Sequence, residues 1–204
     1  MKKTKFFSVI IISFLLMSFS VLNNHVDYFI VDSKQSQIEW IGEKVSGTHT
    51  GTILLSGGTV KNNHGSISGN FEFDMTSISN ADIKNEKSKK KLEEHLKSTD
   101  FFDVANFPKA TFVISSVTPN VESNSSGYSH IINGNLSIKN ISNEISFKAN
   151  LTMQSDKVTC SGTAIIDRSK FAINYASKTT FPDIGDKMIF DEFKLNFNIV
   201  AIKK

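Results

Sequence analysis

Cysteine, arginine, tryptophan and proline are scarce in this sequence of 204 residues, and the scarcity limits what the chain can be. Cys160 is the only cysteine, so no disulfide can form within the chain and the hydrophobic core alone must hold the fold. Cys160 alternates with Val158 and Gly162 and has no histidine near it in the sequence. This pattern favours a buried, small apolar side chain over a catalytic thiol.

Basic charge is also lacking. The formal net charge of +3 equals the contribution of Lys2, Lys3 and Lys5, and the remaining sequence is neutral with Arg168 as its single arginine. A groove that binds nucleic acid needs a basic face, to which arginine usually contributes. We therefore expect no nucleic-acid partner.

The first residues have the pattern of a secretory signal peptide. The three lysines precede an apolar run at Phe6–Met17, and Ser18 and Ser20 supply small residues at the spacing of a cleavage site. The run is shorter than the roughly 20 apolar residues that span a membrane, although an uncleaved anchor is the alternative. No cysteine near the boundary offers a site for N-terminal lipid modification. We predict a signal peptide at residues 1–20, a linker at 21–27 and export to the periplasm or the extracellular space.

Most of the remaining chain is predicted to form β-strands. Apolar and polar residues alternate along each segment, most clearly in Glu144–Met153, which leaves one apolar face per strand. We predict a break at Gly57, Gly58 and Lys61–His64, and a polar turn at Asp32–Ser36. The predicted strands are Tyr28–Val31, Gln37–Val45, His49–Leu55, Gly65–Met75, Ala110–Val117, Tyr128–Lys139, Glu144–Met153, Val158–Arg168 and Met188–Ile202.

One segment, Asn85–Lys97, is predicted to be helical. It contains good helix formers, and only Leu92 and Leu96 are large and apolar. The segment Asp100–Phe112 follows, with four phenylalanines and one proline in thirteen residues. Because these rings cannot lie on the helix, we expect them to be buried beside it as a plug or lid of an apolar interior.

About eight to ten strands, short polar turns and one helix predict an all-β protein with an antiparallel sheet. A sandwich and a closed barrel both fit this element order. The chain length suits an eight-stranded barrel, whose bore can hold one small ligand, and no strand has the proline or lysine protection of an exposed edge. We predict a β-barrel of about eight strands with one inserted capping helix, over residues 28–204.

No catalytic or metal-binding motif is present in the sequence. The five histidines lack HxH, HxxxH and HExxH spacings, so no metal site is predicted. For these histidines, structural hydrogen bonding is favoured over a metal or proton role. Arg168 is expected either to pair with Asp186 or Asp191 or to bind a ligand phosphate. An apolar bore suits binding better than turnover, so we do not expect an enzyme.

Four ordered segments share a family pattern. Trp40–Gly51 reads W-x-G-x-K-x-x-G-x-H-x-G, and His95–Pro108, followed by Phe112, reads H-L-x-S-x-D-F-F-D-V-x-x-F-P. Gly134–Asn140 matches G-x-L-x-I-x-G except that asparagine, which tolerates left-handed geometry, replaces the last glycine. The fourth comprises Ile166–Arg168, Tyr175 and Asp186–Phe193. Together these segments resemble the YceI-like family of exported polyisoprenoid-binding proteins.

The resemblance implies a lipocalin-like barrel that holds a long isoprenoid chain, as in quinones or polyprenyl phosphates. The expected function is non-enzymatic binding, transport or storage of such a lipid, with no other cofactor. One alternative is an envelope scaffold that binds a protein partner, which would expose Phe101 or Phe107. Another is a lipid-modifying enzyme, with histidines or carboxylates converging inside the barrel. For the lysine-rich helix, a solvated face is favoured over contact with a membrane surface, because Glu86, Glu93 and Glu94 offset much of the charge of the lysines at 87–91.

The ligand-binding candidates are the phenylalanines after the helix and the apolar strand residues expected to face inward. Two questions remain open from the sequence: whether the rings only plug the barrel or also touch a ligand, and whether the interior is solid or contains a channel. The candidates are Phe71, Phe73, Phe101, Phe102, Phe107, Phe112, Phe147, Leu151, Phe193, Leu195 and Phe197.

Overall fold

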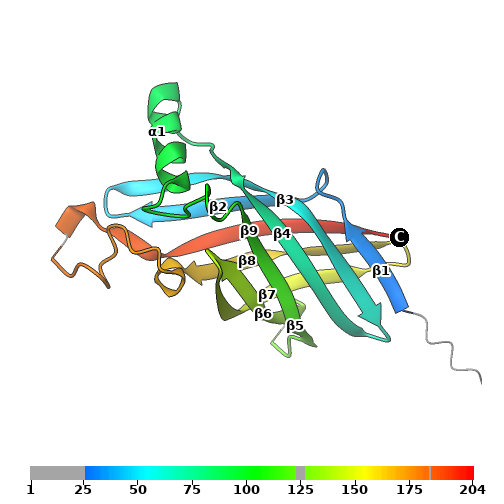
Figure 1. The fold of residues 1–204 in the computed structure, drawn as a ribbon. Coiled ribbons are helices and arrows are strands. Elements are labelled where there is room, and N and C mark those ends of the chain that lie inside the picture. Colours follow the sequence, from blue (N-terminus) through cyan, green and yellow to red (C-terminus); the bar gives the residue numbers. More distant parts are fainter. Residues whose placement is uncertain (1–25, 123–126, 184) are drawn as a thin grey trace, which may run out of the picture.

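The computed structural model describes residues 26–204 except 123–126 and 184. Within these residues the chain forms nine strands, one α-helix and two short 3-10 helices (Figure 1). The predicted all-β class with one inserted helix is therefore confirmed. In chain order the elements are β1 (Val26–Val31), β2 (Gln37–Lys44), β3 (Gly47–Asn63), β4 (Ser66–Asn80), α1 (Glu86–Lys97), β5 (Lys109–Pro119), β6 (His130–Ile138), β7 (Ile141–Met153), β8 (Lys157–Asp167), η1 (Arg168–Phe171), η2 (Gly185–Lys187) and β9 (Ile189–Lys203).

Eight of the strands close into an antiparallel barrel. The neighbours follow the order β3–β2–β9–β8–β7–β6–β5–β4, and β4 pairs back with β3. Closure pairs the backbone groups of both sheet edges with each other. The predicted barrel is thus confirmed, and the sandwich is excluded.

The ninth strand, β1, lies in line with β2, because both pair with β3 and with β9. The predicted turn at Asp32–Ser36 separates them. There the Asp32 carboxylate accepts hydrogen bonds from the backbone of Lys34 and Gln35, and the Val200 N–H donates to Ser36 Oγ at 3.0 Å. One wall position of the barrel is therefore filled by two successive strands.

The predicted linker at residues 21–27 ends too late. Val26 and Asp27 already pair with Asn63 and Asn62, so the strand begins two residues earlier than predicted. The predicted signal peptide at residues 1–20 and the rest of the linker lie outside the described residues.

The break predicted at Gly57 and Gly58 is wrong. β3 runs through both glycines to Asn63, and only His64 and Gly65 form the turn into β4. The pairing register of β3 with β4 shifts between Leu55 and Gly57. A β-bulge of this kind bends a strand without ending it, which explains why glycine here was mistaken for a turn.

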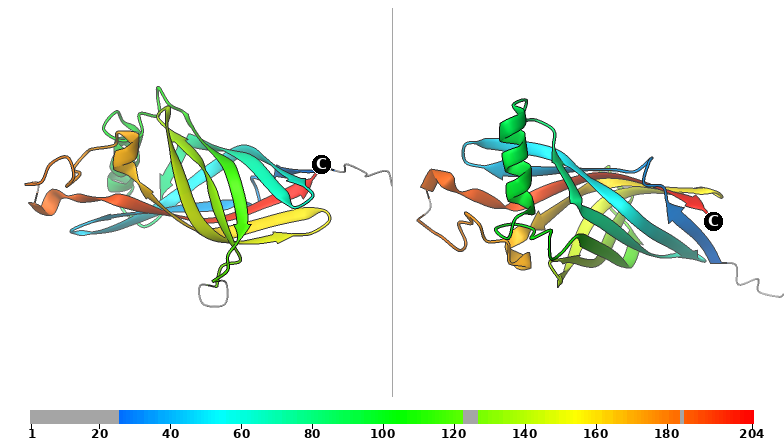
Figure 2. Two further views of the ribbon diagram at one scale, coloured as in Figure 1. Left: turned by 90° about the horizontal axis from the view of Figure 1, so that it is seen from below. Right: turned by 45° about the horizontal axis from the view of Figure 1, so that its top comes forward.

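Helix α1 stands at one end of the barrel, and the C-terminus lies at the other (Figures 1 and 2). Its start agrees with the prediction, since the Asn85 side chain accepts a hydrogen bond from the Ser88 N–H at 3.0 Å as N-cap. The buried Asn80 ties the helix to the sheet. Its backbone N–H donates to Glu93 on α1, and its amide donates to the Thr50 carbonyl on β3.

Aromatic rings on the inner wall lie directly over glycines of neighbouring strands. A methyl group added to Gly134 on β6 would lie 2.5 Å from the Phe112 ring and 2.5 Å from the Val113 carbonyl oxygen on β5. Gly51 has the same role beneath Trp40, whose indole N–H donates to the Ser79 carbonyl at 3.1 Å. Only glycine leaves room for these rings against the wall.

We predict that Gly134→Ala lowers the free energy of unfolding by about 1–3 kcal/mol, because the added methyl group overpacks Phe112 and the backbone. Denaturant titration followed by circular dichroism measures the change. Gly42→Ala is the matched control, since a methyl group at that position meets no atom within 4 Å. Equal stability of the two variants would contradict this account of Gly134.

Candidate ligand-binding site

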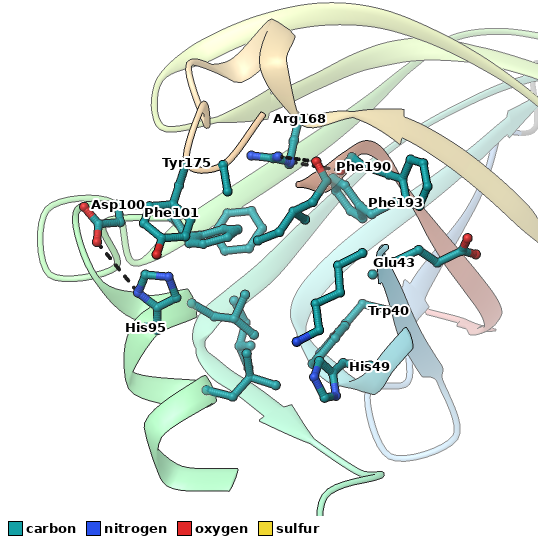
Figure 3. A pocket seen from close by; sticks show the side chains of 18 of the residues that line it. Trp40, Glu43, His49, His95, Asp100, Phe101, Arg168, Tyr175, Phe190 and Phe193 are labelled. Atoms are coloured by element: carbon teal, nitrogen blue, oxygen red, sulfur yellow. Dashed lines mark hydrogen bonds and ion pairs between the residues drawn. The ribbon is translucent and has the colours of Figure 1, made fainter. Parts of the chain in front are cut away.

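A cavity of about 1020 Å³ lies at the helix end of the barrel (Figure 3). Its walls come from the strands, and α1 and the segment after η1 cover part of it. Leu92 and Leu96, the two large apolar residues of the helix, both line this cavity. Its deeper wall is apolar and includes Ile53, Met75 and Ile78. A concave site of this size with a mainly apolar lining is typical of a small-molecule site.

A second cavity of about 100 Å³ lies deeper in the bore, and every residue that lines it is apolar. Phe73, Leu136 and Leu195 line both cavities and form the boundary between them. The interior is therefore neither solid nor one open channel. It is wide beneath the helix and nearly filled beyond these three residues.

Ten of the eleven predicted residues line one or both of these cavities. Phe101, Phe102 and Phe193 line the outer one, and Phe73 and Leu195 line both. The five residues that line the inner cavity alone are Phe71, Phe112, Phe147, Leu151 and Phe197. The inward orientation expected from strand alternation is thus the one observed.

Phe107 lines neither of these cavities, which corrects its placement at the barrel mouth. The chain reverses here with Asp103 in the left-handed region, at φ 48°, and the Phe107 N–H donates to the Asp103 carbonyl. The reversal takes Phe107 out of the cavity lining although it is only six residues from Phe101. Composition alone, which places all four rings beside the helix, does not predict this turn.

Phe101 is the centre of an aromatic cluster between the helix and the segment after η1. Its ring centroid lies 5.0 Å from that of His95 and 5.5 Å from that of Tyr175, and His95 and Tyr175 contact each other at 4.5 Å. Phe101 is only 6% exposed. The ring therefore fixes the helix exit to the cavity wall rather than forming an exposed patch.

Arg168 is 4% exposed and holds the segment around the cavity mouth together. Its guanidinium donates to the carbonyls of Phe190, Ile173 and Ile189, and lies 3.3 Å from Asp191 Oδ1. The predicted structural ion pair with Asp191 is therefore present. Burial lowers the pKa of Arg168, and Asp191 opposes that shift.

The mouth carries polar groups of both signs. Glu43 is held by Lys194 at 2.9 Å, whereas Lys44 and Lys187 have no ion pair with other described residues. His49 and His95 both line the cavity, and each lies near a different carboxylate. In Figure 3 the two rings lie apart on the cavity rim. Polar groups thus surround the mouth of an apolar space.

His49 belongs to a polar cluster that joins the β2–β3 hairpin to the segment before α1. His49 Nδ1 lies 2.9 Å from the Asp82 carboxylate, which also accepts hydrogen bonds from the Thr50 N–H and the Asn80 amide. Burial alone would raise the pKa of Asp82, but these hydrogen bonds outweigh it and lower the pKa to about 2. The second histidine, His95, lies 3.7 Å from Asp100.

No group of three or more histidine, cysteine, aspartate or glutamate side chains among the described residues is arranged to hold a metal ion. Cys160 lines the inner cavity, and burial raises the pKa of its thiol to about 12. It is a small apolar wall residue, as predicted. None of the described helices combines the length and the apolar character that crossing a membrane requires.

The YceI-like domain model matches residues 29–201, which is most of the chain. The chain belongs to the YceI-like family. Two solved structures share this fold. BcnA of Burkholderia cenocepacia has 23% sequence identity and a TM-score of 0.64, covering 84% of this chain and 99% of that one. A polyisoprenoid binding domain from Saccharophagus degradans has 12% identity and a TM-score of 0.61, covering 88% and 100%. No curated protein sequence matches the chain.

Several lining residues of this YceI-like barrel were not among the sequence candidates. Trp40 alternates with Ile38 on β2, and this period-two pattern is the signal that would assign it to the inner wall. Phe181 and Phe190 lie at the mouth and remain 51% and 45% exposed. Phe181 and Tyr175 belong to an irregular segment, so no periodic pattern could assign them to the cavity.

We predict that Asp82→Asn destabilises the protein by about 1 kcal/mol at pH 7, a value reduced for the partial exposure of the carboxylate. A carboxylate with a lowered pKa stabilises the fold above its ordinary pKa of 3.8, and this stabilisation is lost as the pH falls towards 2. The free energy of unfolding should therefore be measured for the wild type and for Asp82→Asn at pH 7 and at pH 2. The difference between the two proteins should be smaller at pH 2. Asp156→Asn is the control, and a difference that persists at pH 2 would contradict the assignment.

We predict that Arg168→Met lowers the free energy of unfolding by about 3–5 kcal/mol, since it leaves Asp191 and three carbonyls without their partner. Lys194→Met, which removes an exposed ion pair with Glu43, should cost less than about 1 kcal/mol. Denaturant titration compares the two. Unchanged stability of the Arg168 variant with weaker ligand binding would instead favour a role in binding a phosphate head group.

Proposed function

We propose that this protein binds an amphipathic isoprenoid lipid, of the quinone or polyprenyl phosphate type, without chemical turnover. The bound lipid would be transported or stored outside the cytoplasm, a location that rests on the N-terminal sequence alone. The tail lies in the barrel and the head group stays near the mouth.

The outer cavity is the observation that carries this proposal. Its volume of about 1020 Å³ and its apolar deep wall suit a branched hydrocarbon tail. Each buried methylene group of such a tail contributes about 0.8 kcal/mol. The polar groups are concentrated at the rim, so a lipid with a polar head can keep that end hydrated while the tail is buried.

The two lysines at the rim give the head group a partner. Lys44 and Lys187 line the mouth without an ion pair to other described residues, and a lysine ammonium binds phosphate as a point charge. His95 and Tyr175, also on the rim, offer hydrogen bonds to a quinone oxygen. Both head-group types therefore remain within the proposal.

Membership of the YceI-like family and one structurally similar protein also support binding of an isoprenoid lipid. The Saccharophagus degradans domain, which shares the barrel, is described as polyisoprenoid binding. The scaffold alternative is less favoured, because Phe101 is buried in the helix cluster and Phe107 is half-buried, so neither forms the exposed patch that a protein partner would use. For an enzyme, histidines or carboxylates would have to converge inside the barrel, whereas His49 and His95 lie apart on the cavity rim (Figure 3).

A bulky residue at Gly42 tests the proposal. Gly42 lines the outer cavity, and a side chain there meets no atom within 4 Å, so Gly42→Phe should fold while it fills part of the tail space. We expect lipid extraction and mass spectrometry to find an isoprenoid in the purified wild-type protein and little in the variant. Quinone affinity should fall by about tenfold or more, which corresponds to about 1.4 kcal/mol.

Gly57→Phe is the matched control. Gly57 also has no atom within 4 Å of an added methyl group, but it lines neither of the two bore cavities. This variant should keep the wild-type lipid content and affinity. The proposal fails if the wild-type protein carries no isoprenoid and binds none when it is supplied, or if both variants bind as tightly as the wild type.

A further inference from the structure

The bore changes abruptly along its length. The outer cavity of about 1020 Å³ ends at Phe73, Leu136 and Leu195, and beyond these residues only about 100 Å³ remains. All residues around the inner space are apolar, so a polar head group has no partner there. Of the two parts of a lipid ligand, only the apolar tail is therefore expected to reach this boundary.

A row of four phenylalanines lies just beyond this boundary. Phe71 and Phe112 have ring centroids 6.3 Å apart, Phe112 and Phe147 are 5.6 Å apart, and Phe147 and Phe197 are 5.4 Å apart. The rings come from β4, β5, β7 and β9 in that order. On the closed barrel two strands separate β4 from β9 on one side and four on the other. The row therefore follows the side of the bore that runs from β4 through β5 and β7 to β9.

Two of these rings cannot move further towards the wall. The Phe112 ring already occupies the space of a side chain at Gly134, and the Phe197 ring lies 3.0 Å from the position of a methyl group at Gly162. Because backbone lies behind both rings, a tail that enters the inner space must displace them along the bore. Displacing close-packed rings loses contacts on every side.

We infer that this phenylalanine row limits how deep a ligand tail can enter and so selects isoprenoid lipids by tail length. The inference rests on the proposed function, because it needs a tail in the outer cavity. Tails that end at Phe73, Leu136 and Leu195 bind with their full length buried. A longer tail must leave part of its chain in solvent or displace the row.

A series of quinones that differ only in the number of prenyl units tests this limit. Trp40 is the only tryptophan and lines the outer cavity, so quenching of its fluorescence reports binding. For the wild type we expect affinity to rise with each added unit up to one length. The next analogue should then bind more weakly by about tenfold or more, the factor by which an apolar pocket rejects a group that it cannot fit.

Phe147→Ala should shift this limit to longer tails, because the Phe147 ring is the link between Phe112 and Phe197. The first analogue that the wild type rejects should gain about tenfold in affinity, while short analogues stay within about twofold. Phe147→Leu serves if the alanine variant does not fold. Ile165→Ala is the control, since Ile165 is 56% exposed on β8 and lines neither of the bore cavities.

A quinone with a photoreactive diazirine at the tip of its tail labels the residues that the tip contacts. The labelled residues show how deep the tail enters, and this result does not depend on lipid partitioning. In the wild type the diazirine should label the boundary residues, and in Phe147→Ala a longer tail should reach Cys160 in the inner cavity. Affinity that rises through the longest quinone in the wild type overturns the depth limit and leaves the proposed function intact. A limit that neither folded Phe147 variant moves overturns its assignment to this row. Failure of every tail length to bind removes the proposed function as well.

Discussion

The pairing of β3 with both β2 and β4 is the constraint on which the rest of this structure depends. It closes the sheet, and closure turns the apolar face of every strand towards one shared space. An eight-stranded barrel is just wide enough for side chains to fill, so the size of the inward residues decides whether a cavity remains. Phenylalanines fill the deep half, whereas smaller side chains such as Ala110 and Gly42 leave the helix end open.

The helix covers this open end with little apolar surface of its own. Leu92 and Leu96 face the cavity, and no residue of α1 is fully buried. Its position depends on a hydrogen bond from the Asn80 N–H to Glu93, within the helix, and on the Phe101 cluster after the last turn. These contacts fix the position of the helix without filling the apolar cavity beneath it, so the cavity stays available to a ligand.

Much of the fold was predictable because its signals are local. Period-two alternation identified the strands and their inward faces, and the composition of Asn85–Lys97 identified the helix to within one residue. Errors arose where two strands interact. In the sequence of one strand, the glycine at the Gly57 bulge looks like a turn residue. The composition of Asp100–Phe112 groups Phe107 with Phe101, whereas the left-handed Asp103 turns the chain between them. In both places the backbone follows partners distant in the sequence.

Periodicity and composition act over neighbouring residues, so they were enough to predict an all-β chain with one helix, its inward apolar residues and the absence of a disulfide. Two features depend on tertiary contacts instead: the division of the bore at Phe73, Leu136 and Leu195, and the hydrogen bonds from Arg168 to three backbone carbonyls at the mouth. The volume of a cavity is the small difference between the volume enclosed by the barrel and the summed volume of the side chains that point inward from eight strands. That difference exists only once the strands are in register around one axis.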